Sequence, residues 1–274
     1  MELQQSVLYA QYIESLHWKI FTIDGVQMFY RNIPLTGGIL KIQRPKRLPT
    51  VKKLVPIIRQ YHVTRVAVEP DEKQNSALYK RWCGDLGKYV KVIRSSYMPT
   101  KTIRVDLTVT EDEIFRRFTE AKRRAVRKAE KNGVTAIESS DIRELIKIKN
   151  KSGGFLGFIT TAGIDKLWPL MYPAHASIVL AHANDGILVG GIFLLFWNTT
   201  AHYWIAGASS EGKKLFAPTL LVWEALKISK KHGCKDFDFV GVWDQRKPKD
   251  HHDWLGFTKF KEGFGGRPFY YPIF

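Results

Sequence analysis

The chain has few cysteines and no long apolar run. Its 274 residues include only two cysteines, Cys83 and Cys234, which lie far apart in the sequence. This count argues against a disulfide framework or a zinc site and suits a reducing compartment. No apolar stretch reaches the roughly 18 residues that a membrane span needs, and residues 1–5 have no signal-peptide pattern. We therefore expect a globular, cytoplasmic protein.

Common catalytic and ligand-binding motifs are also missing. The sequence has no Ser/His/Asp spacing and no nucleophile elbow, and the pairs Gly190-Gly191 and Gly265-Gly266 do not fit a phosphate-binding loop. His251 and His252 are adjacent, but no third ligand is evident nearby. Two neighbouring histidines in a loop are more typical of a surface, so we expect no metal site.

Acidic residues are too few to balance the basic ones. The chain carries 43 lysine and arginine residues against 26 aspartate and glutamate residues, which gives a formal net charge of +17. Such an excess attracts polyanions, whether nucleic acid, anionic lipid or phosphorylated substrates. A basic enzyme whose charge has no specific partner is the alternative, but the charge is concentrated in one segment.

That segment covers residues 116–131, where eight basic side chains face only two acidic ones. Thr110 and Glu113 form a capping box and Asn132-Gly133 is a stop signal, so the sequence predicts a helix over 111–131. Unrelieved like charges cost stability, and we therefore expect an anionic partner for this helix. The eight basic residues are Arg116, Arg117, Lys122, Arg123, Arg124, Arg127, Lys128 and Lys131.

The first part of the chain has an α/β pattern. Apolar patterns typical of strands alternate with amphipathic patterns typical of helices, and Asn75 is a candidate N-cap. The strands are expected at 38–42, 63–68 and 90–93, and the helices at 51–62 and 76–86. A boundary is expected at 95–101, where Met98 is followed by Pro99.

The second part predicts an antiparallel meander followed by a helical crossover. This order is typical of the acetyltransferase-like (GNAT) fold, an α/β (α+β) arrangement of mixed sheets covered by helices. Strands are expected at 102–107, 177–183, 187–197, 201–206 and 237–240, with helices at 141–150, 164–170 and from Pro218 onward.

Six stretches follow one another in an order known from one protein family. They are residues 105–134, 206–209, 216–218, 223–224, 238–241 and 260–265. Together they resemble the FemABX-type aminoacyltransferases, which build the interpeptide bridge of bacterial peptidoglycan. The resemblance covers residues 102–266 well and residues 1–101 more weakly.

The resemblance implies both a fold and an activity. Family members have two acetyltransferase-like domains and move an amino acid from aminoacyl-tRNA to the stem peptide of a peptidoglycan precursor, without a metal or redox cofactor. We expect a compact member without a helical arm, with a divergent first domain at 1–101 and a second domain at 102–266. Residues 267–274 are expected to pack back on the first. The implied partners are aminoacyl-tRNA, a lipid-linked or nucleotide-linked precursor and an anionic membrane surface.

The implied reaction is the aminolysis of an ester, which needs orientation, stabilisation of an oxyanion and a route for the proton. Lys261, in a glycine-rich segment, matches the family lysine that has a stabilising or tRNA-contacting role, and Phe260 beside it is expected to bind substrate. Glu69 precedes Pro70, where some members have an Asp-Pro pair lining the substrate groove. A carboxylate there would accept the proton of the amine or hold its ammonium form, although a plain strand-end residue is equally compatible.

The remaining site residues are basic. Arg44 is expected to contact precursor phosphates. The set expected to bind tRNA is Arg123, Arg124, Arg127 and Lys128.

Departures from the family pattern affect the acceptor. The arginine and tyrosines that hold a nucleotide-linked precursor have no clear counterparts in residues 157–162, and Ile205 stands where a tyrosine is expected. This favours a lipid-linked precursor or a different acceptor.

Two other functions stay open. A coenzyme A-dependent N-acyltransferase would keep the fold, but only Glu211-Gly212-Lys213-Lys214 precedes the Pro218 helix as a candidate pyrophosphate loop. A non-catalytic tRNA- or RNA-binding protein would account for the charge alone.

Overall fold

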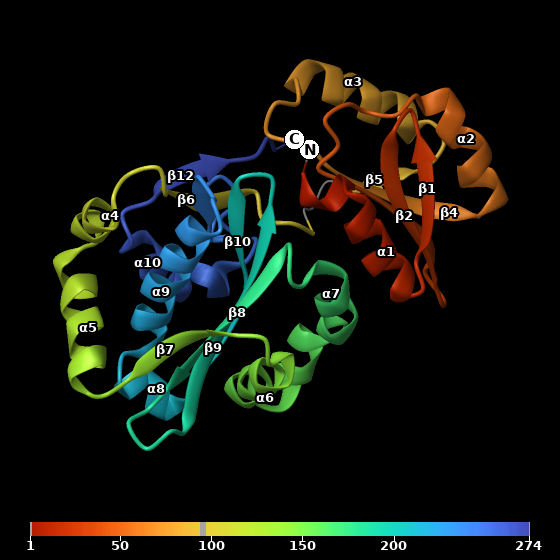
Figure 1. Cartoon of the computed structure of the whole chain (residues 1–274). Helices are drawn as coiled ribbons and strands as arrows, with labels where there is room; N and C mark the ends of the chain where they lie inside the picture. Colours follow the sequence, from red (N-terminus) through yellow and green to blue (C-terminus); the bar gives the residue numbers. More distant parts are fainter. Residues whose placement is uncertain (1, 94–96, 274) are drawn as a thin grey trace. The chain divides into compact units, whose positions relative to one another are not determined.

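The computed structural model of the chain describes residues 2–93 and 97–273. The chain divides into two compact units, one formed by Met1–Thr100 with Tyr270–Phe274 and the other by Lys101–Phe269 (Figure 1). The boundary expected at 95–101 includes Ser95 and Ser96, which lie outside the described residues. No helix within the described ranges combines the length and apolar character that a membrane crossing requires.

The first unit contains a five-stranded mixed sheet in the order β1-β2-β3-β4-β5. The first three strands pair antiparallel and the last three pair parallel. The strands are β1 (Lys19–Ile23), β2 (Val26–Ile33), β3 (Gly37–Gln43), β4 (Val63–Glu69) and β5 (Lys91–Ile93). The helices are η1 (Leu3–Gln5), α1 (Val7–Ser15), α2 (Val51–Gln60) and α3 (Ser76–Gly87).

The core of this unit lies between the sheet and the apolar stripes of α2 and α3. Leu40 and Val66 of the sheet, Leu54 of α2 and Leu86 of α3 are all fully buried in one cluster. The predicted cap of α3 is confirmed, because the Asn75 side chain accepts hydrogen bonds from the backbone N–H groups of Ala77 and Leu78.

The second unit contains a seven-stranded mixed sheet in the order β12-β6-β11-β10-β9-β8-β7. Strands β7 to β10 form an antiparallel meander, β10 pairs parallel with β11, and β11 pairs antiparallel with β6. The strands are β6 (Lys101–Asp106), β7 (Thr135–Ser139), β8 (Ala176–His182), β9 (Leu188–Trp197), β10 (Thr200–Ala208), β11 (Asp236–Asp238) and β12 (Arg267–Tyr270).

Helices cover both faces of this sheet. A Cβ added at Gly190 of β9 would meet Leu221 of α9, whereas one added at Gly191 would meet Leu145 of α6. Since neighbouring strand residues face opposite sides, α6 and α9 lie on opposite faces. The helices are α4 (Glu111–Arg117), α5 (Glu120–Lys131), α6 (Ile142–Ser152), η2 (Gly154–Thr161), α7 (Ile164–Met171), α8 (Ser210–Lys214), α9 (Ala217–Lys231), η3 (His252–Trp254) and α10 (Leu255–Glu262).

The prediction of one helix over 111–131 is wrong, because this segment forms two helices, α4 and α5. Phe118 ends α4 in an extended conformation (ψ 147°), and the Arg123 guanidinium donates hydrogen bonds to the carbonyls of Arg116 and Phe118 at this break. The predicted N-cap is confirmed, since the Thr110 hydroxyl accepts a hydrogen bond from the Glu113 N–H at 3.2 Å.

Lys261 of the glycine-rich segment lies on α10. The glycines that follow bring two backbones together. Gly265 has φ +73°, and a Cβ there would lie 2.4 Å from the Arg117 carbonyl oxygen. A Cβ on Gly266 would lie 2.5 Å from a methyl group of Ile103. Only glycine permits this close approach of the α10 end to α4 and β6.

Candidate functional site

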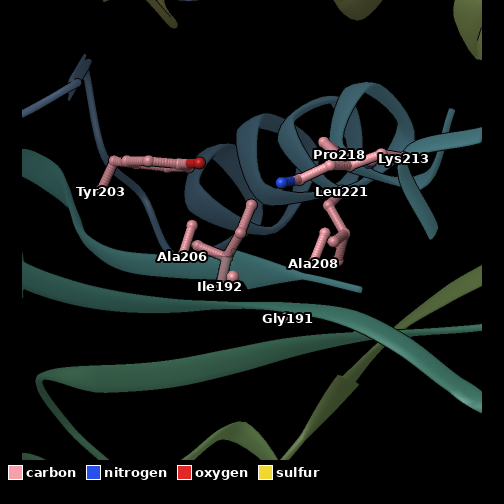
Figure 2. Close-up of a pocket in the computed structure, with 9 residues that line it drawn as sticks. Gly191, Ile192, Tyr203, Ala206, Ala208, Lys213, Pro218 and Leu221 are labelled. Atoms are coloured by element: carbon pink, nitrogen blue, oxygen red, sulfur yellow. The ribbon is translucent and has the colours of Figure 1, made fainter. Parts of the chain in front are cut away.

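A pocket of about 160 Å³ lies in the second unit beside α9 (Figure 2). It is lined by Gly191 and Ile192 of β9, Tyr203, Ala206, Gly207 and Ala208 of β10, Lys213 of α8, and Pro218 and Leu221 of α9. Most of these side chains are small or apolar. The polar groups are the hydroxyl of Tyr203 and the ammonium of Lys213.

The pocket forms where the sheet opens. β11 pairs with β10 only at Thr200, Ala201 and His202, whereas β10 continues to Ala208. Beyond His202, one edge of β10 therefore has no ladder with β11. The register of β10 against β9 also shifts between Tyr203 and Ile205, which is the mark of a β-bulge. An open strand edge beside a helix is a place where a ligand can contact backbone N–H and C=O groups.

Tyr203 and Lys213 define the two ends of the pocket. In Figure 2 the Tyr203 hydroxyl and the Lys213 ammonium point toward each other from opposite sides. The Tyr203 ring packs against Phe239 and Phe237, with centroid distances of 5.5 and 6.2 Å. Burial raises the pKa of Tyr203 well above its usual range, so its phenol is protonated and can donate a hydrogen bond.

Lys261 lies beside Tyr203 but does not line the pocket. Its side chain is buried, and its ammonium donates hydrogen bonds to the carbonyls of Phe239 (2.8 Å) and Gly241 (2.7 Å), just after β11. The same nitrogen lies 5.5 Å from the centroid of the Tyr203 ring. A lysine ammonium has three donor hydrogens, so these two carbonyls leave one for another acceptor.

The charge of Lys261 is held in a largely apolar environment. Burial lowers its pKa to about 8, while the nearby Asp238 carboxylate opposes this shift. Asp238 is itself buried and accepts hydrogen bonds from the Thr102 hydroxyl (2.6 Å), Arg104 Nε (3.0 Å) and the Val240 N–H (2.7 Å). These bonds fix the end of β11. The carbonyls of Phe239 and Gly241, which accept hydrogen bonds from Lys261, follow directly after it.

Stability should depend on pH through Lys261. Below about pH 8 the folded chain holds a buried charge, but between about 8 and 10.5 only the unfolded chain keeps this proton. The burial penalty is therefore lost as the pH rises, and Lys261 should raise the free energy of unfolding by up to about 1.4 kcal/mol per pH unit. Urea titrations of wild type and Lys261→Met across this range isolate the effect, because Lys122 titrates in both chains. A constant difference between the two chains would contradict it.

Phe260 packs between a half-buried lysine and an aromatic ring. The Lys122 ammonium lies 3.7 Å from the centroid of the Phe260 ring, and the Phe264 ring lies 5.1 Å away. Burial lowers the pKa of Lys122 to about 8. Phe260 is thus held against α5 and does not line the pocket, and its expected contact with substrate stays a prediction.

Three of the four basic residues expected to bind tRNA are brought together on the solvent side of α5. Arg124, Arg127 and Lys128 are exposed, although Arg124 also lies 3.4 Å from Glu120. Arg123 is different, because it is half-buried and holds the break between α4 and α5. The exposed three form a cationic surface that a polyanion can reach.

Glu69 and Arg44 lie in the first unit and are both buried. The Glu69 carboxylate accepts hydrogen bonds from Gln43 Nε2 (3.3 Å) and the Met98 N–H (2.5 Å). The Arg44 guanidinium donates to the carbonyls of Pro70 (2.9 Å) and Pro99 (2.6 Å) and stacks 3.3 Å from the centroid of the Tyr271 ring. Both side chains therefore support this unit, and their contacts with substrate stay predictions.

No cluster of three or more His, Cys, Asp or Glu side chains that could hold a metal ion is found within residues 2–93 and 97–273. His251 instead stacks on Trp254, with ring centroids 4.1 Å apart.

Tyr203 was not among the residues expected at the site, and Lys213 was named only in the candidate pyrophosphate loop of the coenzyme A alternative. The available signal was the run Ala206-Gly207-Ala208, since three small residues at the end of a strand leave room that larger side chains would fill. The sequence did not show where β11 ends. The strand was expected to reach Val240, but it ends at Asp238.

The residues of the site lie within a segment of the chain that matches a known protein family. Residues 174–271 match the FemAB family, and this span contains every residue that lines the pocket as well as Lys261. A stretch of 88 residues is 33% identical to a lipid II:glycine glycyltransferase of Staphylococcus haemolyticus (strain JCSC1435). The matched stretch covers 32% of this chain and a fifth (20%) of the length of that relative.

Solved structures extend the likeness to the fold of both units. The crystal structure of FemX superposes with a TM-score of 0.76 at 16% identity, covering 98% of this chain and 90% of that one. A tandem GNAT protein from the clavulanic acid biosynthesis pathway gives 0.53 at 11% identity, covering 89% and 76%. The predicted fold class, two acetyltransferase-like units with mixed sheets covered by helices, is confirmed.

Proposed function

We propose that this chain is a FemAB-family protein that transfers an amino acid from aminoacyl-tRNA to the stem peptide of a peptidoglycan precursor. The observation that carries this proposal is the family match over residues 174–271, since it contains the whole lining of the pocket. The Staphylococcus haemolyticus relative is named as a glycyltransferase that acts on lipid II. A lipid-linked precursor, met at the cytoplasmic face of a membrane, is therefore the acceptor that we propose.

The volume of the pocket limits what it can hold. A volume of about 160 Å³ is close to the roughly 150 Å³ of an engineered protein cavity that holds one benzene molecule. A small aminoacyl group therefore fits. The terminal nucleotide of a tRNA would lie at the mouth of the pocket, near Lys149 and Lys213. Burial lowers the pKa of Lys149, and the nearby charge of Lys213 adds to this shift. Two neighbouring lysines there suit a phosphate.

The second unit supplies the electrostatics that ester aminolysis needs. The acceptor amine attacks the aminoacyl carbonyl carbon, and negative charge develops on the carbonyl oxygen. Lys261 contributes a fixed positive charge beside the pocket in a site of low dielectric, where such a charge has a strong effect. The ribose hydroxyl leaves as the ester C–O bond breaks, and it takes up the proton that the amine gives away.

One incubation tests this proposal. The protein is mixed with a pool of charged tRNAs and either a lipid-linked or a nucleotide-linked precursor, and mass spectrometry identifies any residue added to the stem peptide. We expect the mass of one amino acid, lost when the tRNA is first digested with ribonuclease. Acylation from a coenzyme A thioester in place of tRNA would support the N-acyltransferase alternative. Tight tRNA binding without any transfer would support a non-catalytic RNA-binding protein.

The exposed cations of α5 should carry part of the tRNA affinity. Replacing Arg124, Arg127 and Lys128 together by glutamine should weaken tRNA binding about tenfold at low salt. It should also reduce the slope of log affinity against log salt by about two, since each lost phosphate contact removes roughly 0.7 to 0.9. Filter binding at several salt concentrations measures both. The matched control replaces Lys52, Arg59 and Lys80, exposed residues of α2 and α3, by glutamine. An equal loss in the control would mean that net charge alone attracts tRNA.

A further inference from the structure

The hydroxyl of Tyr203 lacks the internal partner that the hydroxyls of Tyr30 and Tyr79 have. The hydroxyl of Tyr30 donates to the Tyr61 carbonyl (2.8 Å), and that of Tyr79 donates to the Val68 carbonyl (3.0 Å). Among the described residues, none provides a hydrogen bond to the hydroxyl of Tyr203, which instead faces the pocket. A hydroxyl that faces a pocket and has no partner within the protein is free to donate to a ligand bound there.

The backbone explains why this side chain reaches the pocket. Tyr203 is the first residue of β10 after the pairing with β11 ends at His202, and the bulge that follows interrupts the register before Ile205. Bulges change the direction of a strand's side chains. The ring is then held by Phe239 and Phe237, so the hydroxyl has a fixed position.

The surroundings make this phenol a good donor. Lys261 Nζ lies 5.5 Å from the centroid of the ring, and its own position is fixed by two backbone carbonyls. A cation held near an aromatic ring is attracted to the ring, so this contact helps to hold the phenol in place. The hydroxyl also stays protonated at neutral pH, as required of a group that donates to an oxyanion.

We propose that Tyr203 is a catalytic residue whose hydroxyl donates a hydrogen bond to the carbonyl oxygen of the acyl ester held in the pocket. This inference rests on the proposed function and assigns the oxyanion contact within it. When the N–C bond forms, the π electrons of the carbonyl move onto the oxygen that Tyr203 binds. When the carbonyl re-forms, the ester C–O bond breaks and the ribose oxygen takes the proton released by the amine. Tyr203 keeps its own proton throughout.

Tyr203→Phe removes only the hydroxyl and tests the proposal directly. We expect the turnover number at saturating aminoacyl-tRNA to fall about 100-fold, as for other single oxyanion donors, while KM for the tRNA changes less than about threefold. The urea midpoint should be unchanged, since the hydroxyl makes no internal bond. Tyr172→Phe is the matched control, because Tyr172 is 42% exposed in the same unit and should transfer at the wild-type rate.

A fluorinated tyrosine at position 203 provides a readout that a structural role would not affect. Fluorination makes the phenol a stronger hydrogen-bond donor without removing it, so the turnover number at pH 7 should change while KM for the tRNA and the urea midpoint stay level. Normal turnover by Tyr203→Phe, a change confined to KM, or a turnover number at pH 7 that fluorination leaves unchanged would each overturn the catalytic role and leave the proposed function standing. A wild-type protein that transfers no amino acid would overturn both.

Discussion

Replacing Lys261 by methionine should lower the rate of amino acid transfer by about 100-fold or more while the chain stays folded. The change keeps the length of the side chain but removes a positive charge beside the pocket, where electrostatic stabilisation of developing charge has its largest effect. Two effects on folding oppose each other. The carbonyls of Phe239 and Gly241 lose their donor, but a buried charge is no longer desolvated.

Single-turnover transfer, tRNA binding and urea unfolding should be measured on the same Lys261→Met preparation. The catalytic interpretation requires lost transfer together with retained tRNA binding and a cooperative unfolding transition. Lys259→Met is a suitable control, since Lys259 is an exposed residue on the same helix. Transfer within about threefold of wild type would show that Lys261 acts only as a structural tie between α10 and the end of β11.

Filling the pocket should have an effect of similar size. In Ala206→Leu the added carbons enter a space of about 160 Å³ between β10 and α9, which an aminoacyl group could then no longer share. We expect transfer to fall about 100-fold, whereas the free energy of unfolding should stay level or rise because an open apolar space is filled. This combination cannot arise from a folding defect.

The control for this prediction is Ala121→Leu, the same change at an exposed position of α5. It should transfer normally. The size of the donated amino acid provides a second test, because a larger residue should be excluded before a smaller one as the pocket is filled. Equal losses in both variants, or normal transfer by Ala206→Leu, would remove the pocket from the reaction.

Much of the fold was predictable because its signals are local. Alternating apolar residues located β8 to β10, and Asn75 and Thr110 located two helix starts through caps that the structure contains. The elements that escaped prediction depend on distant partners. β1 and β2 are stabilised by pairing along the sheet, and their patterns alone were not distinctive. The break at Phe118 depends on Phe264, which packs 5.0 Å away but lies far along the chain.

The site was predictable only where a motif marked it. Lys261 was identified by its sequence neighbours, and the structure places it beside the pocket. Tyr203 was not, because its role depends on β11 ending opposite His202, which is a tertiary fact. Glu69 and Arg44 show a second limit of prediction from sequence. Their positions in strand-end segments suggested contact with substrate, but residue order does not reveal that both side chains are already bonded inside the first unit.

The close approach of the α10 end to α4 and β6 has a consequence for how sequence variation in this protein should be interpreted. Gly265 and Gly266 each face atoms that even a methyl group would strike, whereas a Cβ at Gly256 of α10 would meet nothing within 4 Å. Selection should therefore hold the first two nearly invariant on steric grounds alone. In a mutational scan they would rank with active-site residues although neither lines the pocket. Intolerance to substitution at these two glycines reflects the packing of the chain. Catalytic residues are better recognised by variants that keep the fold but lose turnover.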